Sequence, residues 1–258
     1  MEPIDTKPFS SMSFNKTLNG LLASKTYGKF CLQVYGRDLS QFNAFDDCQL
    51  QFLISTMRLM QPKNVLDLGC GVGRITEYLS AQIPAKFTGI DFADQLVAAA
   101  NDRNLNNERL SFRTVDINSL PEDLGKFDLI ISIDTLYFAD DLEDIISKLK
   151  TRLTPNGYLV VFFDFRNKKP DAVEPLMPEE ASIGKALNKS GFSFETADFT
   201  ENDKIIWKNA LMVANELKTE FLLEGFENIY EHRVWEAERN LQRHNAGLFR
   251  RAMFIAHI

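Results

Sequence analysis

The stretch Val65-Leu66-Asp67-Leu68-Gly69-Cys70-Gly71-Val72-Gly73 decides the fold of this chain. An apolar run reaches an acid and then breaks into three glycines at alternate positions, after which residues 74–79 resume an apolar pattern at helical spacing. This order predicts a buried strand, a glycine-rich turn and a helix. Glycines allow positive φ and close approach of a ligand, and the first turn of a helix offers backbone N–H groups. We therefore expect a cofactor to bind at this turn, the alternative being a turn whose glycines serve only close packing.

The spacing of the glycines separates two kinds of cofactor site. A dinucleotide-binding G-x-G-x-x-G loop needs a third glycine three residues after the second, and counting from Gly71 that position holds Arg74. The spacing fits D-x-G-x-G-x-G, and here the chain resembles the class I S-adenosylmethionine-dependent methyltransferases, whose first motif is typically V-L-D-L-G-C-G-x-G. The resemblance implies S-adenosyl-L-methionine as cofactor and S-adenosyl-L-homocysteine as product. It places these residues at the cofactor: Asp67, Gly69, Cys70, Gly71 and Gly73.

Two further acids stand at the ends of the next predicted strands. Asp91 ends the second strand, 22 residues after Gly69, where a carboxylate can accept hydrogen bonds from both hydroxyls of a ribose. Asp116 ends the third strand and can accept from the adenine amine, with the Ile117 main chain pairing with the ring; a helix cap is the alternative for Asp116. By the resemblance, Phe92 packs on the adenine face, the alternative being core packing at a helix start.

The fourth predicted strand, 127–132, resembles the fourth motif of the same family. The resemblance places the Ser132 main chain at the methionine end of the cofactor and the following residues at the acceptor. Many relatives that modify small molecules carry a histidine near the position of Tyr137, so this chain lacks that base. An amine or hydroxyl acceptor must lose a proton, and the candidates for accepting it are Asp134, Tyr137 and, from the C-terminal helices, His232 or His244.

Helical and extended patterns alternate along the chain and predict an α/β fold: a Rossmann-like three-layer sandwich. We expect a mostly parallel seven-stranded sheet with an antiparallel C-terminal strand, and one methyltransferase domain over 1–258. Its expected parts are an N-terminal helical segment (13–60), a cofactor-binding core (61–200), a helical cap (201–247) and the final strand (248–258). Within the cap, Thr200 is expected to cap a helix that Gly225 ends.

Composition limits the class of partner. The net charge of −7 at pH 7 argues against a nucleic-acid partner. We interpret Arg239, Arg243, Arg250 and Arg251 as a solvated face, the alternative being a local basic patch. Three cysteines without a C-x-x-C pair predict neither disulfides nor a metal site. No leader-like or membrane-length apolar stretch is visible, so we expect a cytoplasmic protein without a membrane partner.

The sequence favours transfer of a methyl group to a small-molecule acceptor enclosed by the helical segment and the cap. Acids and aromatics in and near the cap suit a cationic amine and so favour N-methylation: Asp198, Glu201, Trp207, Glu220 and Tyr230. The alternatives are O- or C-methylation of a small molecule, a protein or nucleic-acid methyltransferase, and a protein that binds S-adenosylmethionine without methyl transfer. The segment after the fourth strand lacks N/D-P-P-Y/F, which counts against methylation of a nucleic-acid base.

Overall fold

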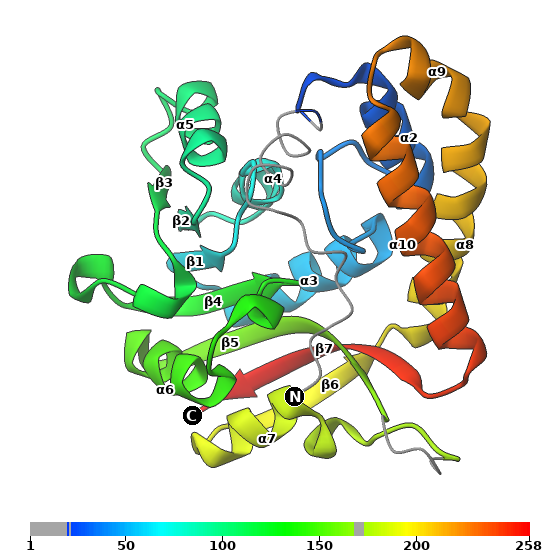
Figure 1. Cartoon of the computed structure of the whole chain (residues 1–258). Helices are drawn as coiled ribbons and strands as arrows, with labels where there is room; N and C mark the ends of the chain where they lie inside the picture. Colours follow the sequence, from blue (N-terminus) through cyan, green and yellow to red (C-terminus); the bar gives the residue numbers. More distant parts are fainter. Residues whose placement is uncertain (1–19, 21, 168–172) are drawn as a thin grey trace.

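A computed structural model describes residue 20, residues 22–167 and residues 173–258. The expectations for the chain before Gly20 and for residue 21 lie outside this part. A seven-stranded sheet in the order β3-β2-β1-β4-β5-β7-β6 forms the centre of the molecule (Figure 1). Its strands are β1 (Asn64–Leu68), β2 (Lys86–Asp91), β3 (Leu110–Thr114), β4 (Phe127–Ile133), β5 (Leu153–Arg166), β6 (Ser193–Asp198) and β7 (Phe249–His257).

The directions of the strands confirm the predicted α/β sheet. β1 pairs in parallel with β2 and β4, β2 with β3, and β4 with β5. β7 is antiparallel to both β5 and β6, between which it lies. The order reverses at β1, so the carboxyl ends of β2, β1 and β4 meet at the topological switch point, where open α/β sheets bind ligands.

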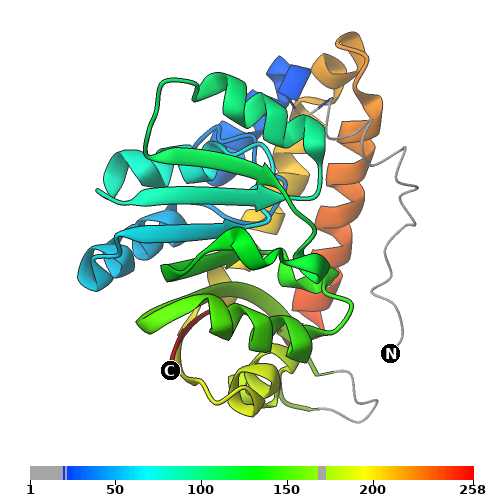
Figure 2. The ribbon, with the colours of Figure 1, turned by 90° about the vertical axis from the view of Figure 1, so that its left-hand side faces the viewer.

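Helices cover both faces of the sheet. Successive side chains of a strand point to opposite faces, and in β1 both faces carry apolar side chains. Along β1, Val65 packs toward one apolar cluster and Leu66 and Leu68 toward another. The first cluster includes α3 (Asp47–Met60) and α4 (Arg74–Gln82), and α6 (Leu142–Arg152) and α7 (Ser182–Lys189) pack in the second. These two apolar clusters make the three layers seen in Figure 2.

A separate helical group stands beyond the carboxyl ends of the parallel strands (Figure 1). Its members are α2 (Lys25–Tyr35), α8 (Thr200–Glu216), α9 (Lys218–Leu223) and α10 (Glu227–Asn245). These helices share a third apolar cluster, to which Val72 of the glycine loop and Ala93 at the start of α5 (Asp94–Arg103) also belong. The group therefore touches the switch point directly.

Two expectations for the cap are wrong in detail. Thr200 is the first residue of α8 rather than its cap, because Asp198 accepts a hydrogen bond from the Thr200 N–H at 2.7 Å. The helix expected to run to Gly225 breaks at Leu217, where α8 ends and α9 begins. Among the described residues, no helix is long and apolar enough to cross a membrane.

Candidate functional site

The glycine loop is fixed by backbone hydrogen bonds to the neighbouring strand. The N–H groups of Gly69 and Cys70 both donate to the Ile90 carbonyl of β2, at 2.8 and 2.9 Å. The three glycines of the loop, Gly69, Gly71 and Gly73, have φ values of +77°, +52° and +77°. Positive φ values are energetically unfavourable for residues with a Cβ, so the backbone explains why glycine occupies these three positions.

The three glycines serve different purposes. A Cβ at Gly69 would lie 2.1 Å from Thr135 Oγ1, and one at Gly73 would lie 2.7 Å from the Phe112 ring. A Cβ at Gly71 would meet nothing within 4 Å. Gly69 and Gly73 are therefore required by the packing of the protein itself, whereas the space beside Gly71 holds no other protein atom.

Asp91 connects this open position to the end of β2. Its side chain is 8% exposed, and its carboxylate accepts hydrogen bonds from the N–H groups of Gly71 and Ala93, each at 2.9 Å. Burial raises the pKa of Asp91, and the two backbone donors oppose this shift. Each carboxylate oxygen can accept further bonds, so Asp91 can also hold a pair of ligand hydroxyls.

Asp67 is buried, in contrast to the exposed side chains of Phe92 and Asp116. It is 3% exposed and accepts a hydrogen bond of 2.5 Å from Thr76 Oγ1, which joins β1 to α4. Burial raises the pKa of Asp67 to about 6. Cys70, half-buried, lies against Gly89 of β2.

The remaining predicted cofactor residues flank the loop along the same sheet edge. Phe92 is 60% exposed, and Asp116 is an exposed cap that accepts from the Asn118 N–H at 2.9 Å. Ile117 is buried, and the Val115 N–H donates to the Asp91 carbonyl at 2.9 Å, so this segment continues beside β2. On the other side, Ser132 is fully buried and pairs in register with Leu68.

Sequence reasoning missed an ionic cluster at the ends of β4, β5 and β7. Arg251 of β7 is fully buried, and both its Nη atoms donate to the Asp134 carboxylate, at 2.8 and 2.9 Å. Arg251 Nη1 also donates to Asp164 of β5 at 2.8 Å, and Nε donates to Gln49 of α3 at 2.8 Å. The sequence held one signal for this cluster: Asp164 and Arg251 are charged residues within two mostly apolar strands. A buried charge requires a partner, so these two residues could have been expected to pair.

The cluster holds more carboxylates than cations. Asp203 of α8 lies 3.8 Å from Arg251 Nε, so three acids surround one guanidinium. Desolvation, together with the charges of Asp203 and Asp134, outweighs Arg251 and raises the pKa of Asp164 to about 8. His244 of α10 is 2.7 Å from Asp203, which places it inside the protein core.

Two of the predicted catalytic residues belong to this cluster. Asp134 has a φ of +55°, rare outside glycine, and its carboxylate is the bidentate partner of Arg251. The Tyr137 hydroxyl lies 3.5 Å from Asp134 Oδ1 and accepts a hydrogen bond from the Asp164 N–H. Burial raises the pKa of Tyr137 well above 10, so its hydroxyl stays protonated at neutral pH.

The third predicted catalytic residue, His232, lies elsewhere on α10. Its ring stacks on Phe42 with centroids 5.2 Å apart, and Nε2 is 3.7 Å from Glu236 Oε2. Glu236 is also the ion-pair partner of Arg233. His232 therefore borders the contact between α10 and the chain segment that follows α2.

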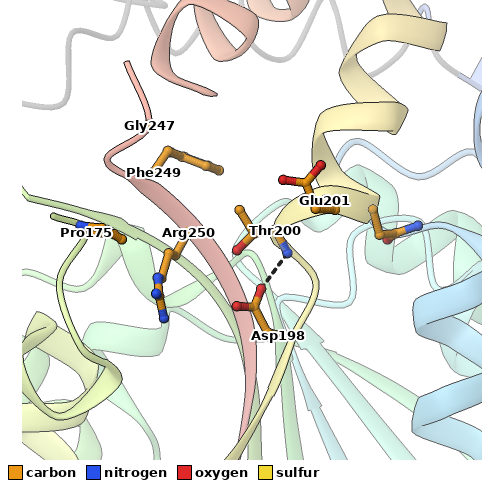
Figure 3. A pocket seen from close by; sticks show the side chains of 8 residues that line it. Pro175, Asp198, Thr200, Glu201, Gly247, Phe249 and Arg250 are labelled. Carbon is orange, nitrogen blue, oxygen red and sulfur yellow. Dashed lines mark hydrogen bonds between the residues drawn. The ribbon is translucent and has the colours of Figure 1, made fainter. Parts of the chain in front are cut away.

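The structure does not gather the cap residues that favoured a cationic acceptor. Trp207 is buried and donates to Asp203 Oδ2 at 2.9 Å, Glu220 pairs with Lys29 at 2.5 Å on the surface, and the Tyr230 hydroxyl donates to Asn215. Asp198 and Glu201 instead line a separate pocket of about 360 Å³ at the start of α8 (Figure 3).

The prediction that four arginines form one solvated face is wrong for Arg251. Arg251 is fully buried, and Arg239, Arg243 and Arg250 are all partly buried. Arg250 lines the pocket of Figure 3, because neighbouring residues of β7 point to opposite faces of the sheet.

Part of the chain is similar in sequence to known methyltransferases. Residues 65–157 match a family model described as a methyltransferase domain. Among curated relatives, norajmaline N-methyltransferase of Rauvolfia serpentina is 31% identical over 132 residues, which are 49% of this chain and 44% of that protein. A malonyl-[acyl-carrier protein] O-methyltransferase of Bacillus cytotoxicus is 40% identical over 105 residues, 40% of this chain and 36% of that protein. The chain thus spans less than half the length of each of these two relatives.

Solved structures share the fold over a longer stretch. The Mycobacterium tuberculosis cyclopropane synthase MmaA2 superposes with a TM-score of 0.72 at 14% identity, covering 95% of this chain and 98% of that one. A Haemonchus contortus phosphoethanolamine N-methyltransferase in complex with S-adenosyl-L-methionine gives a TM-score of 0.72 at 17% identity, covering 95% and 60%. The glycine loop and the sheet order agree with these matches: residues 65–157 match a methyltransferase domain, and the fold of the chain is similar to that of these two structures over nearly all of its length.

Proposed function

We propose that this chain binds S-adenosyl-L-methionine across the carboxyl ends of β3, β2, β1 and β4 and transfers its methyl group to a small molecule. The observation that carries the proposal is the open space at Gly71, the one loop glycine whose missing side chain meets no protein atom. Asp91 is hydrogen-bonded to the Gly71 N–H, so a carboxylate and an approachable backbone lie side by side. This pairing suits the ribose and the methionyl part of the cofactor.

In this proposal five of the predicted cofactor residues have defined tasks. Asp91 accepts from the ribose hydroxyls, exposed Phe92 covers the adenine, and Asp116 with the Ile117 main chain contacts the adenine edge. Asp67 acts through Thr76, because it is buried and its carboxylate holds α4 in place. S-adenosyl-L-methionine supplies a methyl group that its sulfonium already activates, so the protein needs chiefly to position the acceptor and exclude water.

The acceptor is proposed to lie between the strand ends and the cap, beside Asp134 and Tyr137. Tyr137 keeps its proton at neutral pH, so we assign it to hydrogen bonding with the acceptor rather than to accepting a proton. Asp134 is held by Arg251, which fixes its orientation toward Tyr137. His232 is the third candidate, reached from α10.

Nitrogen is the proposed methylated atom, supported by the N-methylating relative from Rauvolfia serpentina. Oxygen is the second candidate, supported by the O-methylating relative from Bacillus cytotoxicus. The two relatives match this chain over similar lengths, so a direct assay must choose between them.

The test is transfer of label from methyl-tritiated S-adenosyl-L-methionine to a panel of amines, phenols and carboxylic acids. The proposal expects labelled product from at least one class with the wild type, and much less with Asp91→Ala. Asp94→Ala is the matched control, because Asp94 is an exposed acid three residues further along. Binding of S-adenosyl-L-homocysteine without transfer to any class would favour a protein that binds the cofactor without methylating a small molecule.

A further inference from the structure

Arg233 is buried in the helical group and carries hydrogen-bond donors that the described part of the chain does not use. It lies on α10, and its side chain is 1% exposed. Its atoms Nε, Nη1 and Nη2 are all buried, and none of them donates a hydrogen bond to a described residue. A buried donor without an acceptor is energetically costly, so three on one guanidinium indicate that a further acceptor belongs there.

The contacts of Arg233 stabilise its charge without using its donors. The guanidinium lies over the ring of Phe42, in the segment after α2, with its carbon 4.4 Å from the ring centroid. A ring in this position contacts the face of the guanidinium and leaves the in-plane N–H groups to other partners. Glu236, one turn further along α10, forms an ion pair with Arg233 Nη2, but not with the geometry of a hydrogen bond. The Tyr35 hydroxyl, at the end of α2, interacts with Arg233 and is likewise buried without a hydrogen bond to the described residues.

Three consecutive residues, 42–44, join Arg233 to the proposed acceptor position. The Ala44 N–H, two residues after Phe42, donates to Asp134 Oδ2 at 3.3 Å. Two residues of extended chain span at most about 7 Å, so the residue that contacts Arg233 lies next to the one that contacts Asp134. Phe42 and Ala44 also pack in the apolar cluster that includes Val72 of the glycine loop. Arg233 therefore belongs to the part of the helical group that adjoins Asp134 and the glycine loop (Figure 1).

Two side chains in contact with Arg233 reach solvent. Phe42 is half-buried, and the side chain of Glu236 is 25% exposed. His232 stacks on Phe42, with ring centroids 5.2 Å apart, and its own side chain is 10% exposed. We expect a ligand to reach the guanidinium from this side, through rotation of the Phe42 and Glu236 side chains.

The donors of Arg233 determine the class of ligand. A guanidinium keeps its charge when it is buried, and its planar fork of N–H groups matches the oxygens of a carboxylate or a phosphate. A neutral amine or hydroxyl would leave most of its five donors without an acceptor. Burial raises the pKa of Glu236, which weakens the competition of this carboxylate for the guanidinium.

We propose that Arg233 binds a carboxylate or phosphate group of the methyl acceptor. The acceptor is then a small molecule that carries an anionic group besides the atom that is methylated. Glu236 contacts the guanidinium when no acceptor is bound and gives way to the anion. This inference rests on the proposed function in identifying the ligand as the methyl acceptor.

Acetate and inorganic phosphate are the probes, each titrated by calorimetry at constant ionic strength into protein saturated with S-adenosyl-L-homocysteine. The wild type should bind at least one of them. Arg233→Lys keeps the charge but loses the planar fork, so the affinity should fall about tenfold, as for one lost charge-assisted hydrogen bond. Glu236→Gln removes the competing carboxylate, so the affinity should rise about threefold, as for one lost, partly exposed ion pair. Arg58→Lys, the same change at an exposed arginine of α3, should bind like the wild type.

Opposite effects of the two ion-pair variants distinguish anion binding from a structural role. Urea unfolding measures the stability of each variant separately. A fall in affinity in Glu236→Gln as well as in Arg233→Lys would indicate a structural ion pair and overturn the inference. A wild type that binds neither probe would also overturn it, as would equal affinities in the wild type and Arg233→Lys. An equal loss in Arg58→Lys would do the same, since the effect would not be specific to Arg233.

A further arm identifies the source of the anion. 5′-Methylthioadenosine lacks the amino-acid part of S-adenosyl-L-homocysteine. If Arg233→Lys weakened binding of S-adenosyl-L-homocysteine but not of 5′-methylthioadenosine, Arg233 would bind the carboxylate of the cofactor, and its assignment to the acceptor would be wrong. Failure of the wild type to bind S-adenosyl-L-homocysteine would refute the proposed function, whereas the probe titrations without it would still test Arg233 as an anion site.

Discussion

Replacing each of two loop glycines by alanine separates ligand binding from packing. At Gly71 the φ of +52° makes alanine strained by about 1 kcal/mol, and its Cβ meets no protein atom within 4 Å. At Gly69 similar strain is joined by a Cβ placed 2.1 Å from Thr135 Oγ1, so overpacking adds about 1 to 3 kcal/mol. Gly71→Ala should therefore fold nearly as well as the wild type, and Gly69→Ala should not.

Although Gly71→Ala should lose little stability, it should lose much of its affinity for the cofactor. Its new methyl group occupies the space assigned to the cofactor, so the affinity for S-adenosyl-L-homocysteine should fall about tenfold or more, about 1.4 kcal/mol. Urea unfolding followed by tryptophan fluorescence gives the stability of each variant, and calorimetry gives the affinity. An unchanged affinity in Gly71→Ala would mean that no cofactor approaches the loop, and the reasoning from the glycines would be refuted.

Three other variants test the buried charges. Burial raises the pKa of Asp164 to about 8 from an ordinary 3.8, so the folded wild type should lose stability as the pH rises from about 4 to 8. The free energy of unfolding of Asp164→Asn, measured by urea unfolding, should fall less between pH 5 and 8 than that of the wild type. An equal fall in both proteins would contradict this prediction. Arg251→Met leaves several carboxylates unpaired and should lower the free energy of unfolding by about 3 to 5 kcal/mol, against less than about 0.5 for Arg58→Met. Thr76→Val removes a donor to buried Asp67 and should cost about 1 to 3 kcal/mol in the same assay, whereas no change would show that the Thr76 hydroxyl contributes nothing there.

The glycine loop and the acid at the end of β2 were predictable because their signals are local in sequence. Positive φ at Gly69, Gly71 and Gly73, and an acid at the end of β2, are requirements of one strand and one turn. The sequence could not show that Gly69 and Gly73 are needed for packing, since Thr135 and Phe112 reach them from distant segments.

The ionic cluster around Arg251 was not predictable, because its contacts join segments that are distant in sequence. Arg251 meets Asp134 and Asp164 across strands that lie far apart in the chain, so their pairing depends on the sheet order. Of the four arginines grouped by sequence proximity, Arg250 and Arg251 point to opposite faces of the sheet because β7 alternates its side chains, and Arg251 is fully buried. Sequence proximity therefore gave the wrong reading of Arg251 as part of a solvated face.

The most direct test of the central claim is the affinity for S-adenosyl-L-homocysteine of the wild type, Asp91→Ala and Asp94→Ala. Asp91 accepts from the Gly71 N–H and is assigned to the ribose, so its loss should weaken binding by about 1 to 3 kcal/mol, roughly five- to 150-fold. Asp94→Ala, at an exposed acid that begins α5, should bind like the wild type. Binding that is absent in the wild type, or equally tight in Asp91→Ala, would contradict a cofactor site at the end of β2.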